Sequence, residues 1–346
     1  MAEAARLDPM ATIFDIDALP EVAAIAPPAD IAALIAAETP VVIRGLVDAW
    51  PAAAIGRRSP QQLNAYLKAM DRGAPGPVME APARGGGRFG YGPDMREFSF
   101  TRRQARIGET LDRMERLIGQ PNAPFVAIQM LPLASHLPAF AAANPMPLLP
   151  GVMPLLWIGG PVRSQTHNDR DHNLACVIAG RRRFLLFPPD QVGNLYIGPP
   201  DRPPPLSLVD PEAPDLDRFP RFRAAMAAAR VARLDPGDAL FLPRYWWHHV
   251  TSLDPYNAMV NYWWGGAPAG IENPNDIFQA ALLAIKELPD SERAYWRAMF
   301  DAHVFRAEDD AVAHIPPDLR GPLGPMRPGQ RAALKQQLLA ALARSP

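Results

Sequence analysis

Two histidines and two aspartates crowd into the stretch SQTHNDRDHN, residues 164–173, directly before a strongly apolar segment. His167 and Asp169 are separated by one residue, and alternate residues of an extended chain point the same way. An imidazole and a carboxylate placed like this can reach the same metal ion. Two ligands do not make a site, so a third must come from elsewhere in the chain.

The adjacent histidines His248 and His249 offer the third ligand, because they end the segment PGDALFLPRYWWHHV (236–250) with a valine after them. The Pro-Gly pair predicts a turn and the apolar residues after it predict a strand. Neighbouring residues of a strand face opposite ways, so only one of the two histidines can join the site. Two histidines and one carboxylate are typical of iron(II) oxygenases and leave coordination positions open on the metal.

The composition limits the class of partner. The chain has 346 residues, is 48% hydrophobic and carries a formal net charge of −1, which gives no long-range attraction to nucleic acid or membrane. Its single cysteine, Cys176, allows no internal disulfide, and the first ten residues lack the features of a secretory leader. We therefore expect a cytoplasmic protein without a nucleic-acid or membrane partner.

Helical and strand patterns divide the chain into three predicted regions. Residues 1–123 read as an α+β cover, with a strand at 41–46 and helices at 27–40, 59–73 and 101–119. Residues 124–268 contain many short strands without long helices between them, which favours a sandwich or barrel. The predicted strands are 125–130, 154–159, 173–180, 182–189, 231–243, 246–253 and 258–265. Residues 269–346 are predicted to be helical, at 274–288, 290–303 and 328–344.

Several stretches resemble the cupin-like JmjC hydroxylases. These are ferrous iron and 2-oxoglutarate dioxygenases related to the asparaginyl hydroxylase that restrains the hypoxia-inducible factor. The resemblance lies in PVVIRGLVDAWPA (40–52), THNDRDHNLACVIAGRRRFLLFPPDQ (166–191), LDPGDALFLPRYWWHHVTSLDP (234–255) and VNYWW (260–264). It implies a mainly β fold with an α layer: a double-stranded β-helix, or jelly roll, with the N-terminal cover and C-terminal helices added.

The resemblance assigns the iron ligands to His167, Asp169 and His248, and it turns His249 away from the metal. His172 and Asp171 are then expected behind the site or at the surface.

The second ligand implied is the cosubstrate 2-oxoglutarate, whose far carboxylate needs a buried cation, because an unpaired buried charge is very costly. The family usually places a lysine two residues after a strand glycine, and this chain has Arg182 there, in GRRRF (180–184). Arginine can hold a carboxylate through two N–H groups. Further positions that resemble pocket residues are Asn173, Asn261, Ser164 and Gln129 for the cosubstrate and Trp263 for the substrate opening.

The function implied is hydroxylation of an unactivated carbon in a protein side chain or small molecule, with consumption of O2 and release of succinate and CO2. The alternatives are a non-catalytic cupin-type binding module or isomerase, and a zinc hydrolase. The first group typically has more histidines near the first motif and lacks the buried basic residue. For the hydrolase, no glutamate base lies in a suitable motif. The C-terminal helices either pack on the barrel or, as the resemblance favours, form a homodimer.

Overall fold

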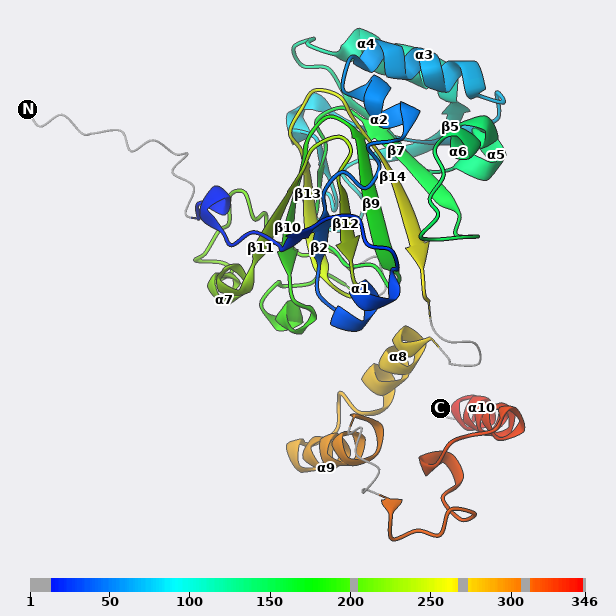
Figure 1. The fold of residues 1–346 in the computed structure, drawn as a ribbon. Coiled ribbons are helices and arrows are strands. Elements are labelled where there is room, and N and C mark those ends of the chain that lie inside the picture. The colour runs from blue at the N-terminus through cyan, green and yellow to red at the C-terminus, as the bar shows by residue number, and fades with distance from the viewer. Residues whose placement is uncertain (1–13, 200–204, 267–272, 306–311, 345–346) are drawn as a thin grey trace, which may run out of the picture. The chain divides into compact units, whose positions relative to one another are not determined.

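Two facing β-sheets form the core of the protein, which a computed structural model describes for residues 14–199, 205–266, 273–305 and 312–344 (Figure 1). The larger sheet has nine strands, in the order β1 (Ala24–Ile25), β2 (Val41–Ile43), β12 (Ala239–Leu242), β9 (His172–Ala179), β14 (Asn257–Trp264), β7 (Pro154–Gly159), β6 (Phe125–Pro132), β3 (Pro75–Ala81) and β5 (Thr101–Arg106). The smaller sheet has five, in the order β11 (Arg230–Leu234), β10 (Arg182–Phe187), β13 (Trp247–Ser252), β8 (Arg163–Ser164) and β4 (Arg88–Phe89).

The facing sides of the two sheets enclose one apolar interior. Strands β9 and β14 of the larger sheet contribute Ala175, Val177 and Met259, while β10 of the smaller sheet contributes Phe184 and Leu186. Almost all neighbouring strands run antiparallel. Two packed antiparallel sheets joined in this order, with helices outside, confirm the predicted jelly roll with an α layer.

Helices cover the outer face of the larger sheet. Leu63 of α3 and Leu111 of α4 pack with Ile128 of β6 and Ile158 of β7 in a second buried cluster. Helix α7 packs on the outer face of the smaller sheet, where Phe222 meets Phe187. The helices of this part of the chain are α1 (Ala32–Ala37), α2 (Pro51–Gly56), α3 (Pro60–Met70), α4 (Ile107–Leu117), α5 (Leu133–His136), α6 (Pro138–Ala143) and α7 (Phe222–Ala228).

The segment 101–119, predicted as one helix, is instead a strand followed by a helix. Thr101–Arg106 forms β5 and pairs with β3, and α4 begins only at Ile107. The apolar stripe that buries the helix also begins at Ile107, whereas Thr101–Arg106 contains no large apolar side chain to bury. Tertiary pairing at the sheet edge therefore decides the structure of these six residues.

A second compact unit covers residues 267–346. It contains α8 (Pro274–Ala284), α9 (Asp290–Phe300), a π-helical turn (Asp301–Phe305) and α10 (Pro328–Leu342), and none of its described residues is buried. No described helix of the chain is both long enough and apolar enough to cross a membrane. The predicted domain boundaries after residues 123 and 268 stay predictions.

The turn between β9 and β10 depends on Gly180, two residues before Arg182, the first residue of β10. Gly180 has φ +65°, and a Cβ there would collide with the backbone carbonyl oxygen of Tyr256. We predict that Gly180→Ala lowers the free energy of unfolding by about 2 to 3 kcal/mol, because both backbone strain and the clash oppose it. Gly193→Ala is the control, since no neighbour lies within 4 Å of its added Cβ. Urea unfolding followed by circular dichroism measures both, and equal stability of the two variants contradicts the prediction.

Candidate metal centre

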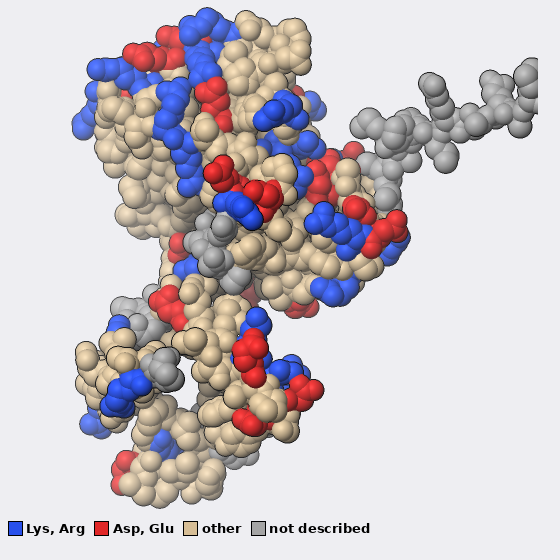
Figure 2. Space-filling view, turned by 180° about the vertical axis from the view of Figure 1, so that it is seen from behind, with Lys and Arg blue, Asp and Glu red and all other residues tan. Residues whose placement is uncertain are grey.

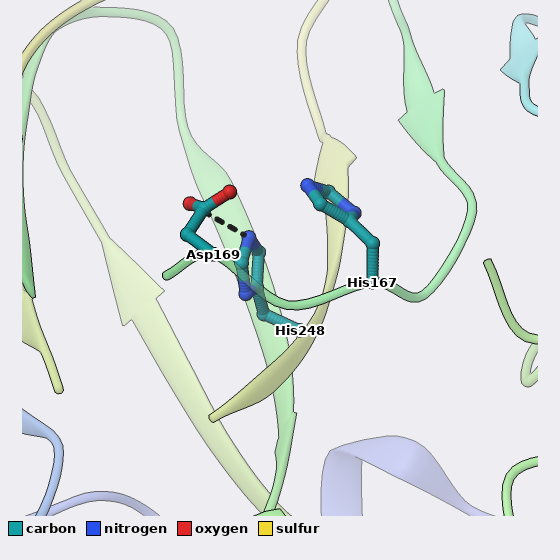
Figure 3. A group of neighbouring side chains, drawn as sticks. All are labelled: His167, Asp169 and His248. Carbon is teal, nitrogen blue, oxygen red and sulfur yellow. Dashed lines mark ion pairs between the residues drawn. The ribbon is translucent and has the colours of Figure 1, made fainter. Parts of the chain in front are cut away.

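Three side chains with metal-binding atoms meet at one end of the jelly roll. His167 and Asp169 lie in the loop between β8 and β9, and His248 is the second residue of β13. One ligand atom from each lies within 4.8 Å of the others, and all three project to the same side (Figure 3). His248 is buried, while His167 and Asp169 are half-buried. The group has the ligand types of a two-histidine, one-carboxylate metal site, and its partial exposure leaves it accessible to a metal ion.

A reciprocal backbone bridge holds the two histidines together. The N–H of His167 donates to the carbonyl of His248 at 3.1 Å, and the N–H of His248 donates back at 2.7 Å. Their ring centroids are 4.3 Å apart. Asp169 is tied to the same strand end, because its carbonyl accepts the N–H of Tyr245 at 2.8 Å. The spacing of the three residues is therefore fixed by main-chain contacts.

Side-chain contacts orient both imidazoles toward a metal. Nδ1 of His167 lies 2.8 Å from the carbonyl oxygen of Gln165, and Nδ1 of His248 lies 3.1 Å from that of Trp246. With Nδ1–H donating to these carbonyls, each Nε2 keeps the lone pair that binds a metal. Burial, with the neighbouring His167, lowers the pKa of His248 below its ordinary value, although Asp169 opposes this shift. His248 therefore stays in the neutral form that a metal requires.

Strand register decides between the two adjacent histidines. His248 lies opposite Leu186 of β10, whose side chain faces the interior, and His249 lies opposite Leu185, which belongs to the outer cluster. Nε2 of His249 is 3.6 Å from the carboxylate of Glu212. His249 thus faces away from the metal group.

Glu212 contacts three side chains on the outer face of the smaller sheet. His249, with hydrogen bonds from Arg183 and Thr251, holds the pKa of Glu212 down to about 2 against the opposing effect of burial. Glu212 is not among the predicted residues, because it lies in a Pro-rich segment, 198–218, and no spacing connects it to β13.

Arg182 faces the interior from the far end of β10. Arg182 lies four residues before Leu186, the residue paired with His248. The two positions are therefore roughly 13 Å apart along the strand. The side chain of Arg182 is buried; Nη1 is 3.2 Å from Sδ of Met259 and Nε has no acceptor. Burial lowers its pKa to about 10, so the group is still charged at neutral pH. Within the described part of the chain, no carboxylate forms an ion pair with it.

A short chain of hydrogen bonds crosses the inner face of the larger sheet. Nε1 of Trp157 donates to Oδ1 of Asn261 at 2.6 Å, and Nδ2 of Asn261 donates to Oδ1 of Asn173 at 3.3 Å. Trp263 lies opposite Asn173 in the register and packs edge-to-face on Trp157, with centroids 5.8 Å apart. Trp157 is not among the predicted site residues; the signal for it in the sequence is the alternation within the strand at 154–159.

The remaining sequence-predicted residues lie around this interior. Oγ of Ser164 accepts the N–H of Val250 at 2.9 Å, which fastens β8 to β13. Gln129 is half-buried in the irregular part of β6, between Ile128 and Leu131. His172 is buried and stacks on Phe241 of β12 with ring centroids 5.9 Å apart. It therefore packs within the larger sheet and is not part of the metal group. Asp171 is half-buried in the loop before β9.

Comparison with known proteins gives a family match over most of the chain. The cupin-like domain family matches residues 28–269. HSPB1-associated protein 1 of Homo sapiens is 41% identical over 115 residues, which are 31% of this chain and 22% of that protein. Lysine-specific demethylase JMJ31 of Arabidopsis thaliana is 38% identical over 109 residues, 30% of this chain and 19% of that protein. The tRNA wybutosine-synthesizing protein 5 of Gallus gallus is 28% identical over 146 residues, which are 38% of this chain and 44% of that protein. The chain spans about a fifth of the first two relatives and less than half of the third.

The adjacent histidines provide a matched test of the metal group. We predict that His167→Ala or His248→Ala weakens binding of iron(II) by more than the roughly 10- to 100-fold loss typical of residues behind a site. His249→Ala is the control and should keep nearly full affinity, because its ring faces Glu212. Anaerobic titration with iron(II), with circular dichroism to check the fold, measures the effect. Loss of binding in His249→Ala but not in His248→Ala would reverse the assignment.

Proposed function

Because the chain belongs to the cupin-like domain family, we propose that it is an iron(II)- and 2-oxoglutarate-dependent oxygenase of the JmjC type. Its reaction would hydroxylate an unactivated carbon of a protein side chain or a small molecule, using O2 and releasing succinate and CO2. One observation carries the proposal. The buried guanidinium of Arg182, which has no acidic partner among the described residues, faces the same interior as a two-histidine, one-carboxylate group.

The three metal-binding residues fit iron(II). Nε2 of His167, Nε2 of His248 and the carboxylate of Asp169 would hold the ion, and this set leaves positions for further ligands. Bound iron would supply the redox chemistry that couples decarboxylation of the keto acid to oxygen insertion. No side chain of the protein would need to act as an acid or base in this reaction. Its residues hold ligands, bind the cosubstrate and exclude water.

Arg182 would bind the far carboxylate of 2-oxoglutarate. The guanidinium is buried and charged, and its Nε lacks an acceptor, so a carboxylate would supply what the folded chain leaves unsatisfied. Asn173 and Asn261 are buried and hydrogen-bonded to each other on the inner face of the larger sheet, where their amides would bind the keto acid. Ser164 and Gln129 would line the pocket, and Trp263 would border the substrate opening.

The substrate is proposed as a protein side chain or a small molecule. The names of two relatives mention lysine demethylation and tRNA wybutosine synthesis, so they do not agree on one substrate. Mass spectrometry of a host lysate incubated with the protein, iron(II), ascorbate and 2-oxoglutarate tests for a product that has gained one oxygen atom. The Asp169→Ala variant is the control for products that form without the enzyme.

Succinate formation tests the proposal separately from substrate identity. Slow conversion of 2-oxoglutarate to succinate by the intact protein supports an oxygenase. Binding of a divalent ion without any binding of 2-oxoglutarate would instead indicate a cupin-type binding module or isomerase.

Arg182 gives the sharpest prediction for the cosubstrate. Removing one member of a buried charge pair costs roughly 3–5 kcal/mol, so Arg182→Ala should weaken 2-oxoglutarate binding about 10²- to 10⁴-fold and leave metal affinity nearly intact. Arg182→Lys should keep part of the affinity. Arg181→Ala is the matched control, because Arg181 is exposed and pairs with Asp254. Calorimetric titration of the metal-loaded protein measures this, and unchanged affinity in Arg182→Ala would contradict the assignment.

The helices of residues 267–346 are proposed to form a homodimer. Large apolar side chains there are exposed, among them Phe278 at 49%, Leu283 at 77% and Trp296 at 41%. Where such side chains join into one apolar surface, they mark interaction sites in soluble proteins.

We predict that the intact chain is a dimer in light scattering and that Leu283→Glu shifts it toward the monomer. A charge buried in an apolar interface is costly, which gives the direction of the shift. Gln279→Glu, which introduces the same charge in the same helix without removing an apolar side chain, is the control. A monomeric intact chain would remove the proposal.

A further inference from the structure

Strand β5 is an edge of the nine-stranded sheet: among the described strands it pairs with β3 alone (Figure 1). Its six residues, Thr101–Arg106, include three exposed arginines: Arg102, Arg103 and Arg106. An open edge offers backbone hydrogen-bonding groups to another extended chain. Figure 2 shows Lys and Arg side chains gathered in a stripe over this region.

The prolines of β3 determine which backbone groups of β5 remain open. Directly opposed residues of an antiparallel pair alternate between hydrogen-bonded and non-bonded pairs. Pro77 lies opposite Gln104 and has no N–H, so this pair is non-bonded, and by alternation so is Met79 opposite Arg102. The N–H and C=O groups of Arg102 and Gln104 therefore point away from the sheet. No described residue hydrogen-bonds to them.

The arginines of β5 lie on both faces of the strand. Arg102 lies opposite Met79, which packs in the same small cluster as Phe100, and its guanidinium stacks on Phe98 and Phe100 at 5.3 and 5.2 Å from their centroids. Such cation–π contacts hold the side chain in place. Arg103 lies on the other face, near Glu80.

The described neighbours of β5 neutralise its charge only in part. Both oxygens of Glu80 already accept hydrogen bonds from Arg113, each at 2.6 Å. Arg106 has only a 3.9 Å contact to Glu109, between two exposed side chains. Within the described residues, neither Arg102 nor Arg103 forms an ion pair. A strand placed beside β5 would meet a positive charge on each face.

We propose that β5 is a docking edge for an acidic, extended segment of a partner protein, which binds by adding a strand to the larger sheet. Backbone pairing with Arg102 and Gln104 would supply affinity, and acidic side chains opposite the arginines would supply specificity. A second copy of the same edge is disfavoured, because like charges would face each other. This inference does not depend on the oxygenase chemistry.

The test uses the full chain and a fluorescein-labelled peptide, Glu-Val-Thr-Glu-Glu-Thr, which places acidic residues opposite the three arginines in an antiparallel register. Fluorescence anisotropy at low salt should show binding that weakens as salt screens the charges. Replacing every Glu of the peptide by Gln, or methylating alternate backbone amides, should each abolish most of the binding. The methylated peptide tests the backbone bonds without changing the protein.

Two variants separate charge from strand pairing. Gln104→Pro removes one outward N–H and should weaken binding about fivefold, the loss expected for one hydrogen bond. Arg102→Glu leaves the backbone groups unchanged and should weaken binding about tenfold. Arg223→Glu, at an exposed arginine of α7, is the control and should have little effect. Thermal melts followed by circular dichroism check that each variant is folded.

Three results would overturn the proposal. The first is equal binding of the acidic peptide and its Gln version. The second is full binding of the methylated peptide, which would leave charge alone as the cause. The third is tighter binding of a single-stranded RNA oligonucleotide that is lost in Arg102→Glu but kept in Gln104→Pro, which would make β5 a nucleic-acid surface instead. Because no metal or 2-oxoglutarate is present in the assay, a failed oxygenase proposal would not affect its outcome.

Discussion

The two-residue alternation of side chains along β10 and β13 is the constraint on which the site depends. These strands pair in one register, so that Arg182, Phe184 and Leu186 face the interior together with His248. A shift of one residue would send His249 inward and put Arg181 or Arg183 in place of Arg182. The outer ion pairs of Arg181 and Arg183 oppose this shift, because it would bury one of these charges and break its pair. Strand register thus selects which polar groups meet inside.

Arg182 places a charged side chain in the buried interior of the fold. A guanidinium removed from water without a partner is unfavourable, and most buried charges in proteins are paired. Its two neighbours in sequence do find partners on the outside: Arg181 pairs with Asp254, and Arg183 pairs with Glu212. Three consecutive arginines therefore have distinct environments that follow from strand geometry alone. Among the described residues, the one of the three without an ion pair is Arg182, which faces the same interior as the metal group from the opposite end of β10.

Much of this arrangement can be predicted from residue types and spacing, and some cannot. The motif His167-x-Asp169, the apolar strands and the Pro-Gly turn predict a sandwich or barrel with metal ligands on its inner face, and the resemblance selects the jelly roll and His248. The strand at 101–106 is not predictable in this way, since Thr101–Arg106 owes its conformation to β3, a partner that also escaped detection. Glu212 and Trp157 were missed for the same reason. Each acts through a contact between segments far apart in sequence, which local patterns do not encode.

The backbone bridge between His167 and His248 has a consequence for metal supply. Main-chain hydrogen bonds set the spacing of the ligands before any ion arrives, so the site does not choose its ion by folding around it. Nitrogen and oxygen ligands of this kind bind copper, nickel and zinc more tightly than iron(II), following the general order of divalent ions. Which ion occupies such a site in a cell is then governed by the concentrations of the free ions there. Protein produced in a zinc- or nickel-rich medium would carry those ions in place of iron.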